Sequence, residues 1–469
     1  MSALRFGTSG WRGRIAEEFT SANVERVCAG IVAALRASGV ARPRLALGHD
    51  ARFMGAEMAD EAARALVAWG AEVVRDRGPI PTPAIALAVI ERGLDGAVNL
   101  TASHNPPEWN GIKFSDRRGG PAPPEVTRRI EECVPETGAA PAGQAPGSLT
   151  QADLRGPYLR ALAKKVDLDR IRASGLRLGL DLSYGAARGT LDRLLSERGI
   201  PFVTARDRED PLFGGRAPDV GEAHLEDLAA LVRAGTADLG LAVDGDADRF
   251  GVLDRDGSFV PPNIVLMILA DAWARERGDR QGIGRSVATT HGLDAVAEHW
   301  GARLYETPVG FKYLGELIHL DQVFFAGEES AGLSVRHHLP EKDGGLAVLL
   351  AAECVARSGL TLAELRDELF ARVGEFHSAR IDVRLEVDDR PLLQAALERP
   401  LADLAGAAVA RVVRLDGVKW VAADGSWALV RPSGTEPVAR VYIEGRSRLR
   451  LAALREWAGG FTTRLKSGS

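Results

Sequence analysis

Cysteine and long apolar runs are scarce in this chain, and each scarcity excludes a class of protein. The 469 residues include 3 cysteines, Cys28, Cys133 and Cys354, and none of them forms a Cys-x-x-Cys pair. The sequence therefore predicts reduced core thiols and a cytoplasmic location rather than a disulfide framework. The N-terminus has no extended apolar segment, and no apolar run is long enough to span a bilayer. We expect neither a signal peptide nor a membrane partner.

Charge of either sign is not in large excess. With Lys+Arg 59 against Asp+Glu 64 the net charge is −5, which gives no reason to expect a nucleic-acid partner. The residues are 45% hydrophobic and 26% charged, as is typical of a soluble globular protein. Lysine is rare beside arginine, yet Lys113, Lys312 and Lys342 all fall in polar, glycine-containing stretches that we expect to be loops. A compact ammonium group at such places suits contact with a phosphate.

A strand, polar loop, helix and second strand recur three times along the chain. The repeats begin at Arg44, Arg177 and Arg285, about 110 to 130 residues apart. They indicate three similar α/β domains with mixed sheets, whose strand ends present loops to a central cleft. The last part of the chain is typical of a smaller α+β domain. The predicted domains are residues 1–149, 150–257, 258–373 and 374–469.

A serine follows the apolar segment 94–100, in the run Thr101-Ala102-Ser103-His104-Asn105-Pro106. It would stand on a loop at the end of a buried strand, where α/β sheets usually place their chemistry. A nucleophilic hydroxyl needs a proton acceptor and a charge stabiliser, and His104 and Lys113 are candidates for these roles. The run alone is equally compatible with an ordinary polar turn, because Ser, Asn and Pro are turn formers.

Three aspartates, Asp244, Asp246 and Asp248, follow the apolar segment 239–243 at alternate positions. On an extended loop their carboxylates converge, and hard oxygen ligands suit Mg²⁺ or Ca²⁺. An EF-hand is excluded because its glycine and glutamate positions hold Arg249 and Arg255. Carboxylates packed this closely repel one another unless a cation is present. We therefore predict a Mg²⁺ site with positions left for water and a phosphate oxygen, which Arg249 would face.

Several further segments carry groups suited to a sugar phosphate. Arg12 lies among glycines whose amides could turn toward an anion, although a plain turn fits as well. Glu328 and Ser330 alternate on a stretch that we expect to be an extended loop, where they could bind neighbouring sugar hydroxyls or simply cap a turn. The run from Arg431 to Pro437 combines a guanidinium, hydroxyls and amides into a phosphate cradle.

Together these segments resemble the α-D-phosphohexomutase superfamily, the phosphoglucomutase/phosphomannomutase enzymes. The resemblance covers essentially the whole chain, and the motifs occur in the family's order. Thr-Ala-Ser-His-Asn-Pro is similar to the phosphoserine loop and Asp-Gly-Asp-Ala-Asp-Arg to the metal loop. Gly-Glu-Glu-Ser is similar to the sugar-binding loop, Arg-Pro-Ser-Gly-Thr-Glu-Pro to the phosphate-binding loop, and Gly-Thr-Ser-Gly-Trp-Arg-Gly to the N-terminal signature. Even without the N-terminal signature, the four loop motifs in order are far more specific than any one of them.

The resemblance implies a four-domain, magnesium-dependent isomerase of carbohydrate metabolism with a mobile last domain. Ser103 would carry a phosphoryl group, give it to a hexose phosphate, and recover the other phosphoryl group once the bisphosphate has turned around. Mg²⁺ would be held by Ser103, through its phosphoryl group, with Asp244, Asp246 and Asp248. The implied catalytic residues are Ser103, His104, Lys113, Arg12 and Arg249. The implied substrate-binding residues are Thr307, Gly310, Lys312, Glu328, Ser330, His338, Lys342, Arg431, Ser433, Gly434 and Thr435.

The sugar is indicated by fewer residues. Dual-specificity relatives have a histidine soon after the serine of the sugar-binding loop, whereas this chain has Ala331-Gly332-Leu333. The segments 309–312 and 338–344 resemble the phosphoglucomutase branch instead. We therefore expect a hexose phosphate partner, specifically glucose 1-phosphate and glucose 6-phosphate, with glucose 1,6-bisphosphate as activator. The alternative is a phosphomannomutase or dual-specificity enzyme.

Two other classes are less favoured. A Mg²⁺-dependent sugar phosphatase would use an aspartate nucleophile in the Asp244 loop and would need no phosphoserine. A non-catalytic sugar-phosphate-binding protein could keep the fold without the chemistry. The non-catalytic reading is disfavoured because the serine, the three aspartates and both candidate phosphate loops, around Arg12 and Arg431, are all present. We expect a monomer or a homodimer.

Overall fold

The protein was analysed as a computed structural model that describes residues 4–7, 10–386, 389–432 and 438–467. Its contacts divide the chain into two compact units. The first comprises Met1–Val265 and Gly310–Glu364, and the second comprises Leu266–Val309 and Leu365–Ser469.

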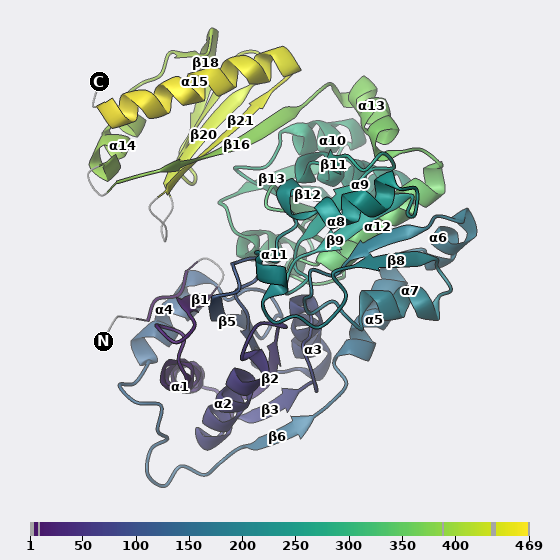
Figure 1. Ribbon diagram of the computed structural model, residues 1–469. Helices are drawn as coiled ribbons and strands as arrows, with labels where there is room; N and C mark the ends of the chain where they lie inside the picture. The colour runs from purple at the N-terminus through teal and green to yellow at the C-terminus, as the bar shows by residue number, and fades with distance from the viewer. Residues whose placement is uncertain (1–3, 8–9, 387–388, 433–437, 468–469) are drawn as a thin grey trace. The chain divides into compact units, whose positions relative to one another are not determined.

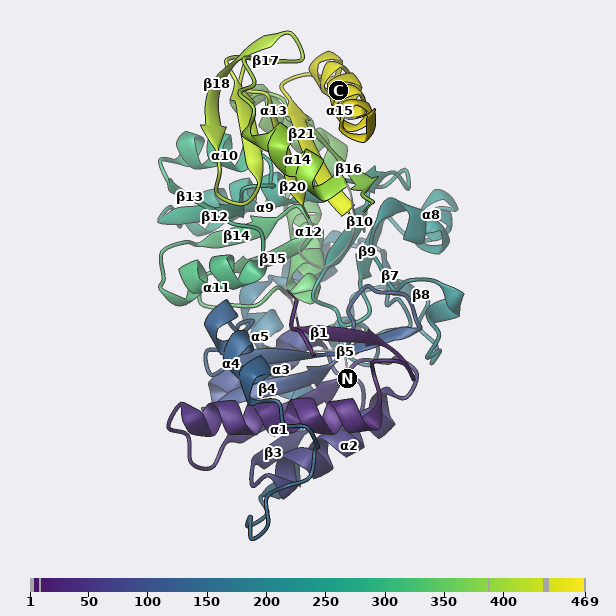
Figure 2. The same ribbon diagram turned by 90° about the vertical axis from the view of Figure 1, so that its left-hand side faces the viewer.

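The first sheet of unit 1 has six strands in the order β1-β5-β4-β2-β3-β6 (Figure 1). These strands are β1 (Trp11–Arg14), β5 (Trp109–Asp116), β4 (Gly96–Leu100), β2 (Arg44–His49), β3 (Glu72–Arg75) and β6 (Ser148–Gln151). Leu45 and Leu47 of β2 pack with α1 (Ser21–Ala37), α2 (Gly55–Ala68) and α4 (Pro124–Cys133) in one apolar core. Figure 2 shows α1 lying along this sheet beside α2. Gly48 faces the other way, where a Cβ would collide with Ile85 of α3 (Thr82–Arg92), so helices cover both faces.

The second sheet of unit 1 has the order β11-β10-β9-β7-β8. Its strands are β11 (Phe259–Val260), β10 (Phe250–Leu253), β9 (Leu239–Val243), β7 (Leu178–Asp181) and β8 (Phe202–Ala205). Strands β9 and β10 pair antiparallel, so the segment between them, which carries the three aspartates, is a tight connection at one end of the sheet. The accompanying helices are α5 (Arg155–Lys165), α6 (Leu168–Ser174), α7 (Leu191–Glu197) and α8 (Glu226–Arg233), with short 3₁₀ turns at Phe213–Gly215 and Glu222–His224.

Unit 1 closes with α11 (Phe311–His319), the hairpin of β14 (Phe325–Glu328) and β15 (Gly332–Val335), and α12 (Gly344–Ser358). Helix α12 is apolar and buried along almost its whole length. Among the residues described, no single helix is long and apolar enough to cross a membrane, and one bent pair, α12 with α13 (Leu362–Val373), passes that test on length and composition alone.

Unit 2 combines most of α9 (Pro262–Arg277), β12 (Gly282–Ser286), α10 (Gly292–Trp300), β13 (Arg303–Thr307) and most of α13 with a C-terminal sheet. That sheet is β16 (His377–Arg384), β21 (Val438–Gly445), β20 (Trp427–Pro432), β19 (Val418–Ala422), β18 (Ala407–Val413) and β17 (Asp403–Leu404). Helices α14 (Asp389–Glu398) and α15 (Arg448–Ser467) cover one face. On the other face Trp427, Leu429 and Tyr442 pack against Val287 and Ala288, which follow β12.

The three predicted repeats are confirmed, because β2–β3, β7–β8 and β12–β13 each form a parallel pair around a helix. Several local predictions were wrong. Lys113 lies on strand β5 and Lys312 in the first turn of α11, so only Lys342 of the three lysines is in a loop. Glu328 is the last residue of β14 instead of a loop residue.

The glycine-rich segment around Arg12 was also misassigned. Arg12 lies on strand β1, directly opposite Gly111 of β5. A Cβ on Gly111 would lie 2.3 Å from the carbonyl oxygen of Trp11, and one on Gly10 would lie 2.4 Å from that of Ile112. These glycines therefore permit the close approach of two backbones, which is a common reason for glycine in a strand.

Candidate active site

Ser103 lies just after β4 and is almost completely buried. Its φ of 53° is in the left-handed region, which is uncommon for a residue with a side chain. Its amide donates to Thr101 Oγ1 at 2.8 Å. Its hydroxyl donates to Asp244 Oδ2 at 2.8 Å, so the serine loop of the first sheet meets the aspartate loop of the second. The juxtaposition joins residues 141 positions apart in the sequence.

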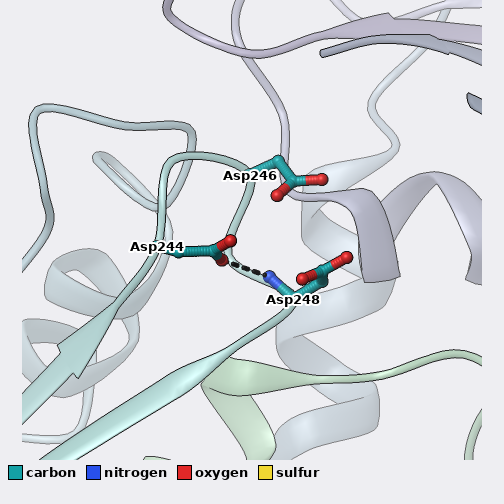
Figure 3. A group of neighbouring side chains, drawn as sticks. All are labelled: Asp244, Asp246 and Asp248. Carbon is teal, nitrogen blue, oxygen red and sulfur yellow. Dashed lines mark hydrogen bonds between the residues drawn. The ribbon is translucent and has the colours of Figure 1, made fainter. Parts of the chain in front are cut away.

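The three aspartates lie on one turn between β9 and β10, where Asp244 points toward the backbone of Asp248 and the side chains of Asp246 and Asp248 project to one side of the turn (Figure 3). All three are buried, and one carboxylate oxygen of each lies within 4.8 Å of the others. Asp244 Oδ1 accepts from the amides of Asp248 and Arg249, both at 3.0 Å, and this closes the turn. Ala247, at the apex, has a φ of 60°.

Two buried lysines face the aspartates. Lys113 Nζ lies 2.5 Å from Asp246 Oδ2 and 2.7 Å from Asp248 Oδ2. Lys342 Nζ, from the loop before α12, lies 3.1 Å from Asp248 Oδ2 and 3.4 Å from Glu341 Oε1. The site therefore holds several charges of each sign in direct contact and largely out of water, where electrostatic interactions are strong.

The pKa values of these groups follow from burial and from the neighbouring charges. Burial, with repulsion from the other two carboxylates, raises the pKa of Asp244 well above its usual value. Burial would also raise the pKa of Asp248, but the ammonium groups of Lys113 and Lys342 hold it far below its usual range. The positive charge of Arg249, followed by burial, lowers the pKa of His104 well below its ordinary value, so the imidazole is neutral at pH 7.

The donor set fits a hard divalent cation. Asp246 Oδ1 and Asp248 Oδ1 are buried and accept no hydrogen bond within the described residues. Buried carboxylate oxygens without a partner are costly, and Mg²⁺ or a similar ion with oxygen ligands would satisfy them. Asp244, Asp246 and Asp248 are thus the residues that could hold a metal.

Side chains expected to hold the sugar surround the same charges. Glu328 is buried, its Oε2 lacks a hydrogen-bond partner among the described residues, and burial raises its pKa although Lys342 opposes this. Ser330 follows in the hairpin turn, next to Ala331 with a φ of 66°. His338 turns its Nε2 to Asp343 Oδ2 at 2.7 Å. Arg12 of β1 donates to Asn105 Oδ1 at 2.8 Å, and so contacts the serine loop.

Gly310 and Lys312 belong to unit 1, where Gly310, with a φ of 126°, precedes α11 and Lys312 Nζ lies over the ring of Tyr313.

Two of the remaining predicted residues belong to unit 2. Thr307 ends β13, and its hydroxyl donates to the carbonyl of Pro308 at 3.0 Å. Arg431 lies on β20 and donates from Nε to Asp416 Oδ2 at 2.8 Å. The other predicted phosphate-binding residues, Ser433, Gly434 and Thr435, lie outside the described residues.

The sequence interpretation missed two supporting contacts. Thr82, the first residue of α3, donates from its hydroxyl to Asp246 Oδ2 at 2.5 Å and from its amide to the Asp246 carbonyl at 2.9 Å. Tyr158 of α5 donates to Asp343 Oδ1 at 2.6 Å. For Thr82 the sequence offered one signal, a hydroxyl residue between two prolines at a helix start, in Pro81-Thr82-Pro83. For Tyr158 the sequence offers no local signal.

Four family models match the chain in sequence order. They describe the α/β/α domains I, II and III of phosphoglucomutase/phosphomannomutase and its C-terminal domain, and they match residues 3–140, 156–257, 261–373 and 383–457. The chain belongs to the α-D-phosphohexomutase superfamily. It is accordingly an enzyme, an isomerase that moves a phosphoryl group within a phosphorylated sugar.

Its relatives carry several substrate names. A phosphoglucomutase/phosphomannomutase of Thermococcus kodakarensis is 32% identical, over 94% of each chain. A phosphoglucosamine mutase of Anaeromyxobacter dehalogenans is 31% identical, over 97% of each chain. The solved structure of a candidate phosphomannomutase from Thermus thermophilus is 36% identical, with a TM-score of 0.85 over 98% of this chain and 99% of that one. The family of this phosphohexomutase is therefore shown, while the sugar has to be argued from its own residues.

Proposed function

We propose that this phosphohexomutase interconverts glucose 1-phosphate and glucose 6-phosphate through a phosphorylated Ser103. The observation that carries the proposal is the hydrogen bond from Ser103 Oγ to Asp244, which places the serine at the three-carboxylate turn that Lys113 also contacts. A serine acting on a carbonyl has no need of such a cluster, whereas a phosphoryl carrier next to a cation site does. A phosphatase using Asp244 would leave Ser103 without a role.

In the first half of the reaction the Ser103 Oγ–P bond breaks, and a new P–O bond forms to the free sugar hydroxyl. The hydroxyl proton passes to His104, which follows Ser103 in the chain and is neutral, and Lys113, an ammonium group among the carboxylates, takes part in proton transfer as a donor when a proton is returned. After the bisphosphate has turned around, the reverse exchange returns its other phosphoryl group to Ser103. When bound, Mg²⁺ held by Asp244, Asp246 and Asp248 offsets negative charge on the transferring group.

The remaining residues hold the substrate. Glu328 and Ser330 accept and donate hydrogen bonds to ring hydroxyls, and Lys342 adds a cation beside them. Arg12 and Arg249 contribute positive charge toward the phosphoryl group. Arg431, with Ser433, Gly434 and Thr435, is proposed to bind the phosphate that is not reacting. Thr307, Gly310 and Lys312 are proposed as further substrate-binding residues. Glucose is favoured for two reasons. Residues 338–344 resemble the phosphoglucomutase branch, and residues 331–333, which follow Ser330, lack the histidine that dual-specificity enzymes have soon after this serine.

Intact-mass spectrometry and coupled assays test the proposal. Purified protein treated with glucose 1,6-bisphosphate should contain a species heavier by one phosphate, and Ser103→Ala should abolish both this species and turnover. Turnover should be fastest on glucose 1-phosphate when glucose, mannose and glucosamine 1-phosphates are compared. Steady release of inorganic phosphate without a phosphoprotein would refute the mutase mechanism, and faster turnover of mannose 1-phosphate would replace glucose by the alternative substrate.

A further inference from the structure

A buried arginine outside the motifs described above holds the backbone of the serine loop. Arg52 lies between β2 and α2, and its side chain is fully buried together with that of Asp50. Its Nε donates to Asp50 Oδ2 at 3.0 Å. A guanidinium has five N–H donors in a rigid fork, so four donors remain for other partners.

All four of these donors go to main-chain carbonyls between the end of β4 and the first residue of β5. Nη1 donates to Pro106 O at 2.8 Å and to Trp109 O at 2.9 Å. Nη2 donates to Asn105 O at 2.7 Å and to Ser103 O. One side chain thus donates to four carbonyls of this segment, of which Pro106 O also accepts from the amide of Trp109 at 3.1 Å, and buried carbonyls need such partners.

The same network reaches the other polar group of the Ser103 backbone. Asp50 Oδ2 accepts from Thr101 Oγ1 at 2.6 Å, and Thr101 Oγ1 accepts from the Ser103 amide at 2.8 Å. Both the amide and the carbonyl of Ser103 are therefore tied to Asp50, the first through Thr101 and the second through Arg52. The ring of Phe213, from the second sheet's domain, lies 5.0 Å from the Arg52 guanidinium and covers it.

We propose that Arg52 is a positioning residue for phosphoryl transfer and that it fixes Ser103 in its left-handed conformation. A non-glycine residue with a positive φ is held there only if its surroundings determine it, and here both backbone groups are held. Rotation of the Ser103 backbone would swing Oγ away from Asp244, and with it the phosphoryl group away from the metal ligands. Arg52 acts through the loop and does not touch the substrate. This inference rests on the proposed function of Ser103.

Arg52→Lys tests the proposal, because lysine keeps the charge but cannot form a fork to four carbonyls. We expect kcat to fall about 100-fold, the loss that follows from misplacing a reacting group by about 1 Å. KM should change less than about threefold, since the residues assigned to substrate binding are untouched. Arg206→Lys is the matched control: Arg206 is also buried and paired through Nε with an aspartate, Asp181, but it does not contact the serine loop. It should lose stability in the same way and keep its kcat.

Hydrogen exchange gives a readout that does not depend on activity. Amides of the 101–109 segment should exchange faster in Arg52→Lys than in the wild type or in Arg206→Lys. Equal exchange in that segment, or equal kcat values for Arg52→Lys and Arg206→Lys, overturns the positioning role. If the wild-type protein carried no phosphoserine, the proposed function would be refuted. Faster amide exchange of the 101–109 segment in Arg52→Lys would still show that Arg52 holds the serine loop.

Thr101→Val provides a second route if Arg52→Lys does not fold. It keeps the side-chain volume and removes the hydroxyl that links the Ser103 amide to Asp50. We expect a smaller loss of kcat, about tenfold, again with KM nearly unchanged. An unaltered kcat in a folded Thr101→Val protein would contradict the proposal.

Discussion

Removing the hydroxyl of Thr82 should weaken metal binding without removing any metal ligand. Asp246 Oδ2 accepts from Thr82 Oγ1 and from Lys113 Nζ, both at 2.5 Å, and these two donors orient the carboxylate. Asp246 Oδ1 is thereby left free on the side where a cation would bind. Thr82→Val keeps the shape and the backbone contact of residue 82 and deletes only the hydroxyl. The carboxylate can then rotate, because one of its two fixed partners is gone.

The magnitude follows from the role of groups that orient metal ligands, whose loss typically weakens binding about 10- to 100-fold. This corresponds to roughly 1.4 to 2.8 kcal/mol of binding free energy. Stability should fall as well, because Asn99 Nδ2 donates to Thr82 Oγ1 at 2.8 Å and would lose this buried acceptor. We expect that loss to lower the free energy of unfolding by about 1–3 kcal/mol.

Calorimetric titration with Mg²⁺, and Mn²⁺ binding followed by electron paramagnetic resonance, would measure the affinity directly. Thr82→Ser is the matched control, since it restores the hydroxyl and should bind metal nearly as tightly as the wild type. Turnover at saturating Mg²⁺ should recover much of the wild-type rate in Thr82→Val. A folded Thr82→Val protein with wild-type metal affinity would refute the reasoning, as would a Thr82→Ser protein as weak as the valine variant.

Three other predictions concern buried charges. Burial and the nearby Arg285 lower the pKa of Lys419 from 10.5 to about 7, although Glu306 and Glu444 oppose this shift. Between pH 7 and 10.5 Lys419 is therefore protonated in the unfolded chain and largely neutral in the folded protein. Denaturant unfolding of the wild type and of Lys419→Met should therefore be compared between pH 7 and pH 10. We expect the wild-type free energy of unfolding to rise relative to that of Lys419→Met by up to about 1.4 kcal/mol per pH unit. The same pH dependence of stability in both proteins would contradict the prediction. Asp343→Asn should destabilise the protein by about 1–3 kcal/mol and lower its activity, because an amide cannot accept hydrogen bonds from His338, Tyr158 and a helix amide at once. Thermal unfolding would measure the loss of stability. An unchanged melting temperature would exclude a stabilising role for the Asp343 carboxylate. Calorimetry should find Mg²⁺ bound more tightly by the phosphorylated enzyme than by Ser103→Ala, and equal affinities would argue against a shared site.

The sequence was sufficient for features set by local pattern. The three βαβ repeats follow from alternation of apolar segments with polar loops, and Ser103 and the aspartates were placed correctly after β4 and β9. Strand ends are easy to find because a run of buried residues must stop where the chain turns to solvent or to a site. Three carboxylates at alternate positions likewise carry their own physical argument, since only a cation or buried lysines can offset them.

Features that depend on distant partners were missed. Lys113 was assigned to a loop because Asn110 and Gly111 precede it, yet Gly111 serves the close pairing of β5 with β1. Thr82 meets Asp246 across 164 positions in the sequence, and Tyr158 meets Asp343 across 185. Arg52 resembles any surface arginine in a loop, and its role appears only when the backbone carbonyls around it are located. Such contacts arise from tertiary packing, which no local periodicity encodes.

The balance of charge around Ser103 explains why the serine and the aspartates have to act together. Lys113, Lys342 and Arg249 face three buried carboxylates, so the turn carries offsetting charges of both signs. A phosphoryl group on Ser103 would add about two negative charges within reach of Asp244, which already contacts Oγ. Repulsion by the carboxylates would expel it unless a divalent cation entered at the same time, and the cation would gain a phosphoryl oxygen as a further ligand. The proposed role of Ser103 as a phosphoryl carrier therefore depends on the aspartates that the second sheet places directly against it.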